Sequence, residues 1–255
     1  MDGSHQRVDG AAAVRLGPRG LERLAQRGSA KAILPTVHGG RAEAVFLNTA
    51  GGVTGGDRLS YDLTLTRGAA TGTTQTAERA YASPGGPARV DVTLRLGPNT
   101  HLAWLPQETI LFEDSHLHRT TTAHLDEGAT LIGCEMLVLG RRAMGERPAR
   151  LRLTDRREVR VGGAPVWIEP FALTSEALGP SPALLGGAAA LATLYVVGPG
   201  AEDLRFALPE GVEHGASAWD GRAVLRMRAV DPAPLRKALA RALASLLPLP
   251  RVWPR

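Results

Sequence analysis

The sequence predicts a mainly β protein with one clear helix near its C-terminus. Residues 59–66 alternate strictly between apolar and polar side chains, which is typical of a half-buried strand. The same period of two recurs in shorter segments along the chain, whereas an apolar stripe with helical spacing is clear in residues 231–247. No stretch has the composition of a linker. We therefore expect one domain over residues 1–255, with a loose N-terminal arm over residues 1–19.

Residues 47–59 contain four glycines within six positions, directly followed by Asp57. Glycine allows the backbone to adopt positive φ angles and to approach other groups closely. A phosphate-binding loop needs a lysine and a following helix, but here Asp57 takes the place of the lysine and a strand follows. We expect a turn that leads into a strand. Asp57 either faces a cation or accepts hydrogen bonds from nearby amides, and the second reading is the more common one.

Strands are expected along most of the chain. Residues 21–34 fit a strand or a short helix equally well, and residues 38–40 form a turn. Asp220-Gly221 separates two strand segments and is a strong hairpin signal. The remaining strand segments, alternating or continuously apolar, are residues 44–47, 150–161, 165–169, 191–197, 215–219 and 223–229.

The C-terminal helix has clear boundaries. Asp231 is its expected cap, Pro232 fits its first turn, and Pro248 ends it. Its apolar stripe consists of Leu235, Leu239, Leu243, Leu246 and Leu247. A second, weaker helix is expected between residues 178–192, although two prolines and two glycines in that segment oppose it.

A weak repeat runs through the first half of the chain. Gly68, Gly97 and Gly128 each follow a strand-like alternation and precede another short strand, at separations of 29 and 31 residues. This spacing is typical of stacked or wound strand units. Stacking of the units would place several polar residues near one another. These residues are Gln75, Gln107 or Glu108, and Glu135, with Asp57 close by. Polar groups at matching positions of a β body usually face solvent. A column that faced inward would instead form a polar channel, because buried carboxylates need partners or water.

Composition narrows the partners and the compartment. The net charge is +5, but the arginines are scattered and aromatic residues make up 4%, so we expect no nucleic-acid partner. Cys134 is the single cysteine, which excludes an internal disulfide and is typical of a reducing compartment. Residues 1–10 do not resemble a secretory signal, and the longest apolar run, residues 184–197, is too short to span a bilayer. We expect a cytoplasmic protein without membrane association.

The residues alone identify no reaction. His116, His118 and His124 share one face of a predicted strand and could bind a metal, but exposure on a strand is the more common arrangement. Cys134 lies in an apolar stretch and is expected to be buried and inert. A hydrolase with paired carboxylates could be built from Glu108, Glu113, Asp114 or Glu135.

Five segments carry a resemblance to a known family: residues 48–57, 73–77, 105–112, 137–141 and 143–146. Residues 185–187, 216–219 and 249–253 extend it over nearly the whole chain. In this order they resemble the UreD family of urease accessory proteins, called UreH in some organisms. The resemblance implies a helically wound, layered β-sheet body with very few helices and no enzymatic activity.

The resemblance also implies a function. Members act in nickel incorporation into apo-urease, in a complex with the helical protein UreF and the GTPase UreG, and an internal tunnel is the proposed nickel route. We therefore expect transient Ni²⁺ and no tightly bound cofactor. The residues expected along the route are Asp57, Gln75, Glu108, Glu135 and Glu146. The alternatives are a small-molecule hydrolase and a structural adaptor that never contacts metal.

Overall fold

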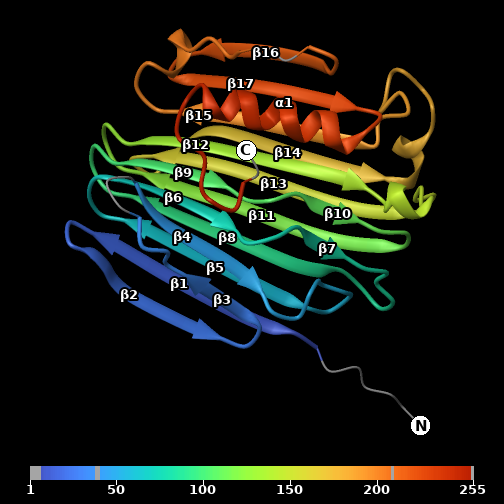
Figure 1. Cartoon of the computed structure of the whole chain (residues 1–255), viewed down its shortest axis with the longest axis horizontal. Coiled ribbons are helices and arrows are strands. Elements are labelled where there is room, and N and C mark those ends of the chain that lie inside the picture. Colours follow the sequence, from blue (N-terminus) through green and yellow to red (C-terminus); the bar gives the residue numbers. More distant parts are fainter. Residues whose placement is uncertain (1–6, 38–40, 208–209, 254–255) are drawn as a thin grey trace.

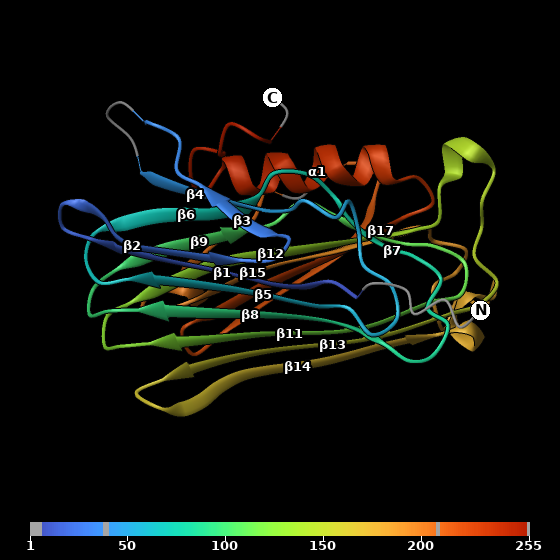
Figure 2. The same cartoon turned by 90° about the horizontal axis from the view of Figure 1, so that it is seen from below.

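The computed structural model describes residues 7–37, 41–207 and 210–253. In these residues two β-sheets pack face to face, and the helix α1 (Pro232–Ala244) lies against the outer side of one sheet (Figures 1 and 2). The prediction of a mainly β, layered body with a C-terminal helix is confirmed. None of the helices in the described residues has the length and apolar composition that a bilayer crossing requires.

The first sheet has the strand order β14-β13-β11-β8-β5-β1-β2. Its strands are β1 (Asp9–Gly17), β2 (Gly20–Arg27), β5 (Arg58–Leu65), β8 (Ala88–Leu96), β11 (Ser115–Leu125), β13 (Leu151–Val161) and β14 (Ala164–Thr174). The four strands from β5 to β13 run parallel to one another, as Figure 2 shows for the lower layer. The outer strands β14 and β2 each pair antiparallel with their neighbour.

The second sheet has the strand order β16-β17-β15-β12-β9-β6-β4-β3, with β10 paired to β12 and β7 paired to β10. Its strands are β3 (Ala30–Ile33), β4 (Ala42–Asn48), β6 (Ala69–Thr74), β7 (Glu78–Ala80), β9 (His101–Leu105), β10 (Thr109–Leu111), β12 (Thr130–Leu139), β15 (Ala190–Val197), β16 (Glu213–Trp219) and β17 (Arg222–Ala229). The hairpin predicted at Asp220-Gly221 joins β16 and β17, and both turn residues have positive φ angles.

The repeat of about thirty residues is the winding of the chain between the two sheets. β5, β8 and β11 are parallel neighbours in the first sheet, and β6, β9 and β12 are parallel neighbours in the second. Gly68, Gly97 and Gly128 lie where the chain crosses from one sheet to the other. Gly68 has a φ of 81°, a conformation that favours glycine. The prediction of wound strand units is therefore confirmed.

Two expectations are wrong. Within the loose arm expected over residues 1–19, Asp9–Gly17 form the ordered strand β1, because Ala12, Val14 and Leu16 alternate into the core and β1 pairs with both β5 and β2. Residues 1–6 lie outside the described residues. The second helix expected at residues 178–192 is instead a sequence of bends and turns that follows the short 3-10 helix η2 (Ser175–Leu178). Gly186 and Gly187 both have positive φ angles there, which an α-helix cannot accommodate.

The remaining predictions concern strands that the structure shows and one turn that lies outside the described residues. Residues 21–34, which fitted a strand or a helix, form β2 and β3. The strands predicted at residues 44–47, 150–161, 165–169 and 191–197 correspond to β4, β13, β14 and β15. The turn predicted at residues 38–40 lies outside the described residues.

The core has two main parts, on the inner and outer sides of the second sheet. Trp104, Tyr195 and Phe46 are fully buried between the two sheets. On the outer side, Leu235, Leu239 and the rest of the α1 stripe pack against apolar side chains of β9, β12, β15 and β17. Asp231 caps α1 by accepting a hydrogen bond from the amide of Ala233 at 2.8 Å. The helix is therefore integral to the core, although Leu246 is only partly buried.

Replacing Leu239 with alanine should lower the free energy of unfolding by about 2–5 kcal/mol, because a fully buried leucine leaves a cavity under α1. Lys237→Ala, on the exposed side of the same helix, should change it by less than about 0.5 kcal/mol. Denaturant unfolding of the two variants measures the difference. Equal effects would show that α1 contributes little to the core.

Candidate functional site

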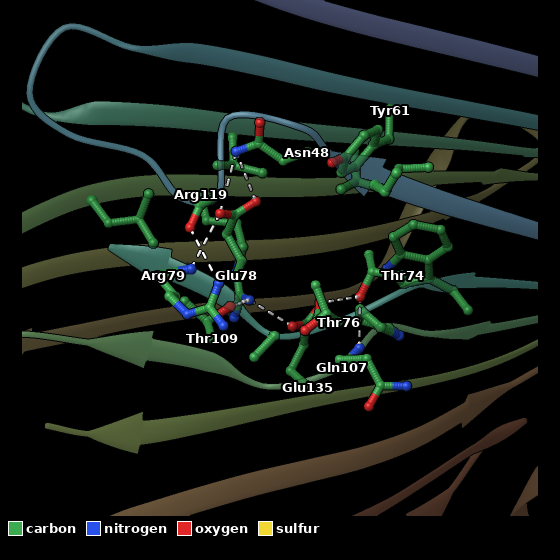
Figure 3. A pocket seen from close by; sticks show the side chains of 18 residues that line it. Asn48, Tyr61, Thr74, Thr76, Glu78, Arg79, Gln107, Thr109, Arg119 and Glu135 are labelled. Atoms are coloured by element: carbon green, nitrogen blue, oxygen red, sulfur yellow. Dashed lines mark hydrogen bonds and ion pairs between the residues drawn. The ribbon is translucent and has the colours of Figure 1, made fainter. Parts of the chain in front are cut away.

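A small polar cavity lies between the sheets, next to the glycine-rich turn (Figure 3). Its volume of about 60 Å³ is enough for a few water molecules. Gly51 and Thr76 are exposed residues of its lining, so the cavity opens beside the turn. The polar side chains in its walls belong to Asn48, Tyr61, Thr74, Thr76, Glu78, Arg79, Gln107, Thr109, Arg119 and Glu135. We call this space the first cavity.

Asp57 and Asn48 hold the glycine-rich turn in place. Asp57 is buried, and its carboxylate accepts hydrogen bonds from the amides of Val8 and Thr54, both at 2.8 Å. Asn48 accepts from the amide of Ala50 and donates to the carbonyl of Gly52, both at 3.0 Å. The structure thus shows Asp57 bound to nearby amides, the more common of its two arrangements. Asp57 does not line the first cavity, but it fixes the turn at the mouth.

Glu78 is a cavity carboxylate that the sequence analysis missed. It lies at the start of β7, where the amide of Asn48 donates to both carboxylate oxygens at 3.4 Å (Figure 3). Burial raises the pKa of Glu78 to about 7, with a further rise from the charge of Asp57, against lowering by the Arg79 amide and by Asn48. The available signal was its position directly after the 73–77 segment, which the stacked units bring to the first cavity.

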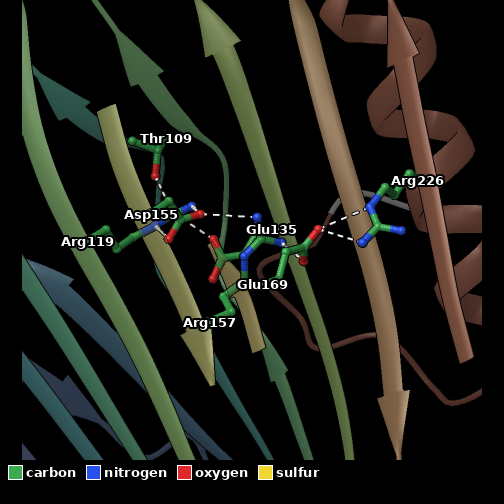
Figure 4. A network of polar contacts seen from close by, with 7 residues as sticks. All are labelled: Thr109, Arg119, Glu135, Asp155, Arg157, Glu169 and Arg226. Carbon is green, nitrogen blue, oxygen red and sulfur yellow. Dashed lines mark hydrogen bonds and ion pairs between the residues drawn. The ribbon is translucent and has the colours of Figure 1, made fainter. Parts of the chain in front are cut away.

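A chain of buried charges crosses the space between the sheets (Figure 4). Arg119 of β11 donates two hydrogen bonds to Asp155 of β13, at 2.7 and 3.0 Å, and a third to the hydroxyl of Thr109 at 3.0 Å. Its Nη1 also lies 2.7 Å from Oε2 of Glu135 on β12. Arg157 lies 3.3 Å from both Asp155 and Glu169. The result is an alternating sequence of positive and negative groups.

The pKa values of the two central carboxyls move in opposite directions. Burial raises the pKa of Glu135, and the nearby charge of Arg119 only partly opposes it. Burial also acts on Asp155, but the charge and hydrogen bonds of Arg119, together with the charge of Arg157, hold the pKa of Asp155 below its usual value. The arginines therefore stabilise the charged form of Asp155 more strongly than the charged form of Glu135.

A second cavity of about 390 Å³ lies on the other side of Glu135. Its walls come from β12–β17 and the loop before β15, and it opens at the exposed strand β16. Charged residues in its lining are Glu135, Arg157, Glu169, Glu213, Arg226 and Arg228. Glu135 lines both cavities and is the one residue that their linings share within the described part of the chain.

The structure brings some of the predicted route residues together and separates others. Glu135 and Gln107 share the first cavity, as stacking predicted. Gln75 is exposed at the bend after β6, and Glu108 pairs with Arg236 of α1. Glu146 lies in the loop between β12 and β13, where it pairs with Arg141 at 2.6 Å. Their role on a nickel route stays a prediction.

The other candidate chemistries have little support in the geometry. His116 and His118 lie side by side on β11, with ring centroids 5.0 Å apart. Within residues 7–37, 41–207 and 210–253, no three His, Cys, Asp or Glu side chains gather closely enough to hold a metal. Cys134 is buried as predicted, and burial raises the pKa of its thiol. The carboxylates considered for a hydrolase, Glu113 and Asp114, both pair with Arg150.

Comparison with known proteins gives a consistent result over nearly the whole chain. A family model described as UreD urease accessory protein matches residues 5–254. A urease accessory protein UreD from Cereibacter sphaeroides is 54% identical over 248 residues, which cover 93% of this chain and 90% of that protein. Proteins of the same name from Dinoroseobacter shibae and Brucella suis are 50% and 42% identical, covering 97% and 99% of this chain and 92% and 96% of their own lengths.

Glu78→Gln should remove one component of the pH dependence of stability. The pKa of Glu78 rises from the usual 4.5 to about 7, so between these values the unfolded chain releases a proton that the folded chain retains. Stability from this group is therefore lost as pH rises through that window, by about 2–3 kcal/mol. Denaturant unfolding between pH 4.5 and 7.5 should show this loss in the wild type and in the exposed control Glu127→Gln, but not in Glu78→Gln. Parallel curves for all three proteins would contradict the assignment.

Proposed function

The chain belongs to the UreD family of urease accessory proteins, and on this basis we propose that it conducts Ni²⁺ into apo-urease through its two cavities. As a member of this family it is a non-catalytic assembly factor for urease. In urease assembly, Ni²⁺ is the cargo of this chain and passes Glu135 on its way to apo-urease.

The observation that carries the proposal is the position of Glu135 in the walls of both cavities. Carboxylate, amide and hydroxyl oxygens dominate the polar lining of the first cavity, and such oxygens bind Ni²⁺ less firmly than imidazole or thiolate groups do. Weak binding favours transport, because a conduit has to release its ion at the far end. Glu78 supplies further oxygen atoms to the lining of the first cavity, and so does the buried Gln107, whose side-chain oxygen also accepts a hydrogen bond from Arg236.

We further propose that the chain works in a complex with UreF, UreG and apo-urease. A groove of about 1120 Å³ between α1 and the C-terminal residues 248–253 supports a docking role. Its described lining includes Lys237, Arg241 and Arg251, which suit an acidic surface on a partner protein. α1 lies on the outer side of the second sheet (Figure 2), and Lys237, Arg241 and Arg251 in the groove are exposed, so the groove is accessible from outside the body.

Glu135→Gln should lower the nickel content and the activity of co-expressed urease roughly tenfold, which corresponds to a loss of about 1.4 kcal/mol of ion stabilisation. Glu135→Asp keeps the charge and should retain most of the activity. The matched control is Glu127→Gln, in an exposed turn away from both cavities. Metal analysis and activity assays on the same preparations measure the effect, with thermal melting to confirm folding. A folded Glu135→Gln protein that supports full nickel loading would exclude Glu135 from the route.

Expression without partners should yield a poorly soluble or self-associating protein, because the partner-facing surface is then uncovered. Co-expression with UreF should give a soluble complex at a defined mass. Size-exclusion chromatography with light scattering distinguishes the two outcomes. A well-behaved monomer that is unchanged by UreF would contradict a scaffold role.

A further inference from the structure

A loosely held arginine, Arg157, lines the second cavity together with Glu135 and Glu169. Arg157 points from β13 into the second cavity, and its side chain is only 4% exposed (Figure 4). Its contacts with Asp155 and Glu169 are both 3.3 Å long. Its Nε has no hydrogen-bond partner within the described part of the chain, and Nη1 has only the 3.3 Å contact with Glu169. Buried donors without partners are unfavourable, so this guanidinium is poorly satisfied where it lies.

Arg119, the neighbouring buried arginine, is held far more tightly. It makes three hydrogen bonds of 2.7–3.0 Å, two to Asp155 and one to Thr109, in addition to its 2.7 Å contact with Glu135. A paired fork of this kind fixes a guanidinium in orientation as well as position. Movement of Arg119 would break all of these contacts, whereas movement of Arg157 breaks two long ones. Arg157 is therefore the movable member of the pair.

Displacing Arg157 would leave an excess of negative charge. The buried chain contains three carboxylates, Glu135, Asp155 and Glu169, balanced by Arg119, Arg157 and Arg226 (Figure 4). Without Arg157, two arginines face three carboxylates in a space shielded from water, which favours entry of a cation. Oε2 of Glu169 would also lose its 3.3 Å contact with Arg157, whereas Oε2 of Glu135 would keep its 2.7 Å contact with Arg119.

We propose that Arg157 is a gate, and that a divalent cation passes between the cavities by taking the place of its guanidinium beside Glu135 and Glu169. The second cavity, at about 390 Å³, has room for the displaced side chain. The cation site exists only while the arginine is displaced. The gate rests on the proposed conduit function and adds its regulation: the arginine returns after the ion and prevents accumulation.

Arg157→Met tests the gate, because methionine fills apolar space without supplying a charge. The full-length Arg157→Met chain is co-expressed with UreF, purified and equilibrated with NiCl₂ by dialysis. It should bind Ni²⁺ roughly tenfold more tightly than the wild type prepared in the same way. Arg160→Met removes a positive charge from the same strand but outside the cavities, where Arg160 pairs with Glu158, and should leave the affinity unchanged. The added affinity should disappear in the double variant Arg157→Met/Glu135→Gln.

Equal nickel affinity in wild type and Arg157→Met, or an equal increase in Arg160→Met, would overturn the gate. If Arg157→Met does not fold, Arg157→Lys replaces it, since a shorter ammonium leaves the carboxylates less covered and should tighten binding roughly threefold. Unchanged affinity in that variant also overturns the gate. The dialysis contains no urease, so it is independent of the conduit test. If Arg157→Met traps nickel but Glu135→Gln leaves urease loading intact, the gate site stands and the conduit function fails.

Discussion

The paired hydrogen bonds between Arg119 and Asp155 are the interaction on which the inner architecture depends. They join β11 to β13 within the first sheet, and the contact of Arg119 with Glu135 links that sheet to β12 of the second. Burying such a group of ions is unfavourable unless every charge is matched, and apolar residues of similar size would pack more tightly. Glu135, a member of this group, lines both cavities of the body.

The winding of the chain determines the level at which Glu135 lies. Each turn of the winding adds one parallel strand to each sheet, so residues about thirty positions apart come to the same level. Glycine and aromatic residues alternate at one such level, where Gly72 and Gly133 flank Trp104 in register. A side chain at Gly72 would collide with Trp104, and one at Gly133 would collide with Tyr195. Beyond these packed rings, in the direction of the chain, β6 and β9 end whereas β12 continues. Glu135 lies on this continuing part of β12 and lines the first cavity.

Much of the fold and part of the site follow from local patterns in the sequence. The thirty-residue spacing predicts the stacking of β6, β9 and β12, and with it the meeting of Gln107 and Glu135 in one cavity. β1 escapes prediction because its run of small alanines becomes a strand only through pairing with β5 and β2. Arg119, Asp155 and Arg157 escape it because charged residues at alternate strand positions normally face water. Their burial depends on partners on other strands, up to 36 positions away, and a single sequence does not reveal which strands become neighbours. The family resemblance supplies the function, which neither composition nor spacing identifies.

The central claim is that a cation crosses the body beside Glu135. Anomalous X-ray scattering at the nickel edge, from crystals of the Arg157→Met chain soaked in NiCl₂, tests it most directly because it locates the ion itself. The account predicts a nickel peak between the two cavities, within coordination distance of the Glu135 carboxylate and close to Glu169. Nickel found solely on the surface, for example beside His116 and His118, would contradict it.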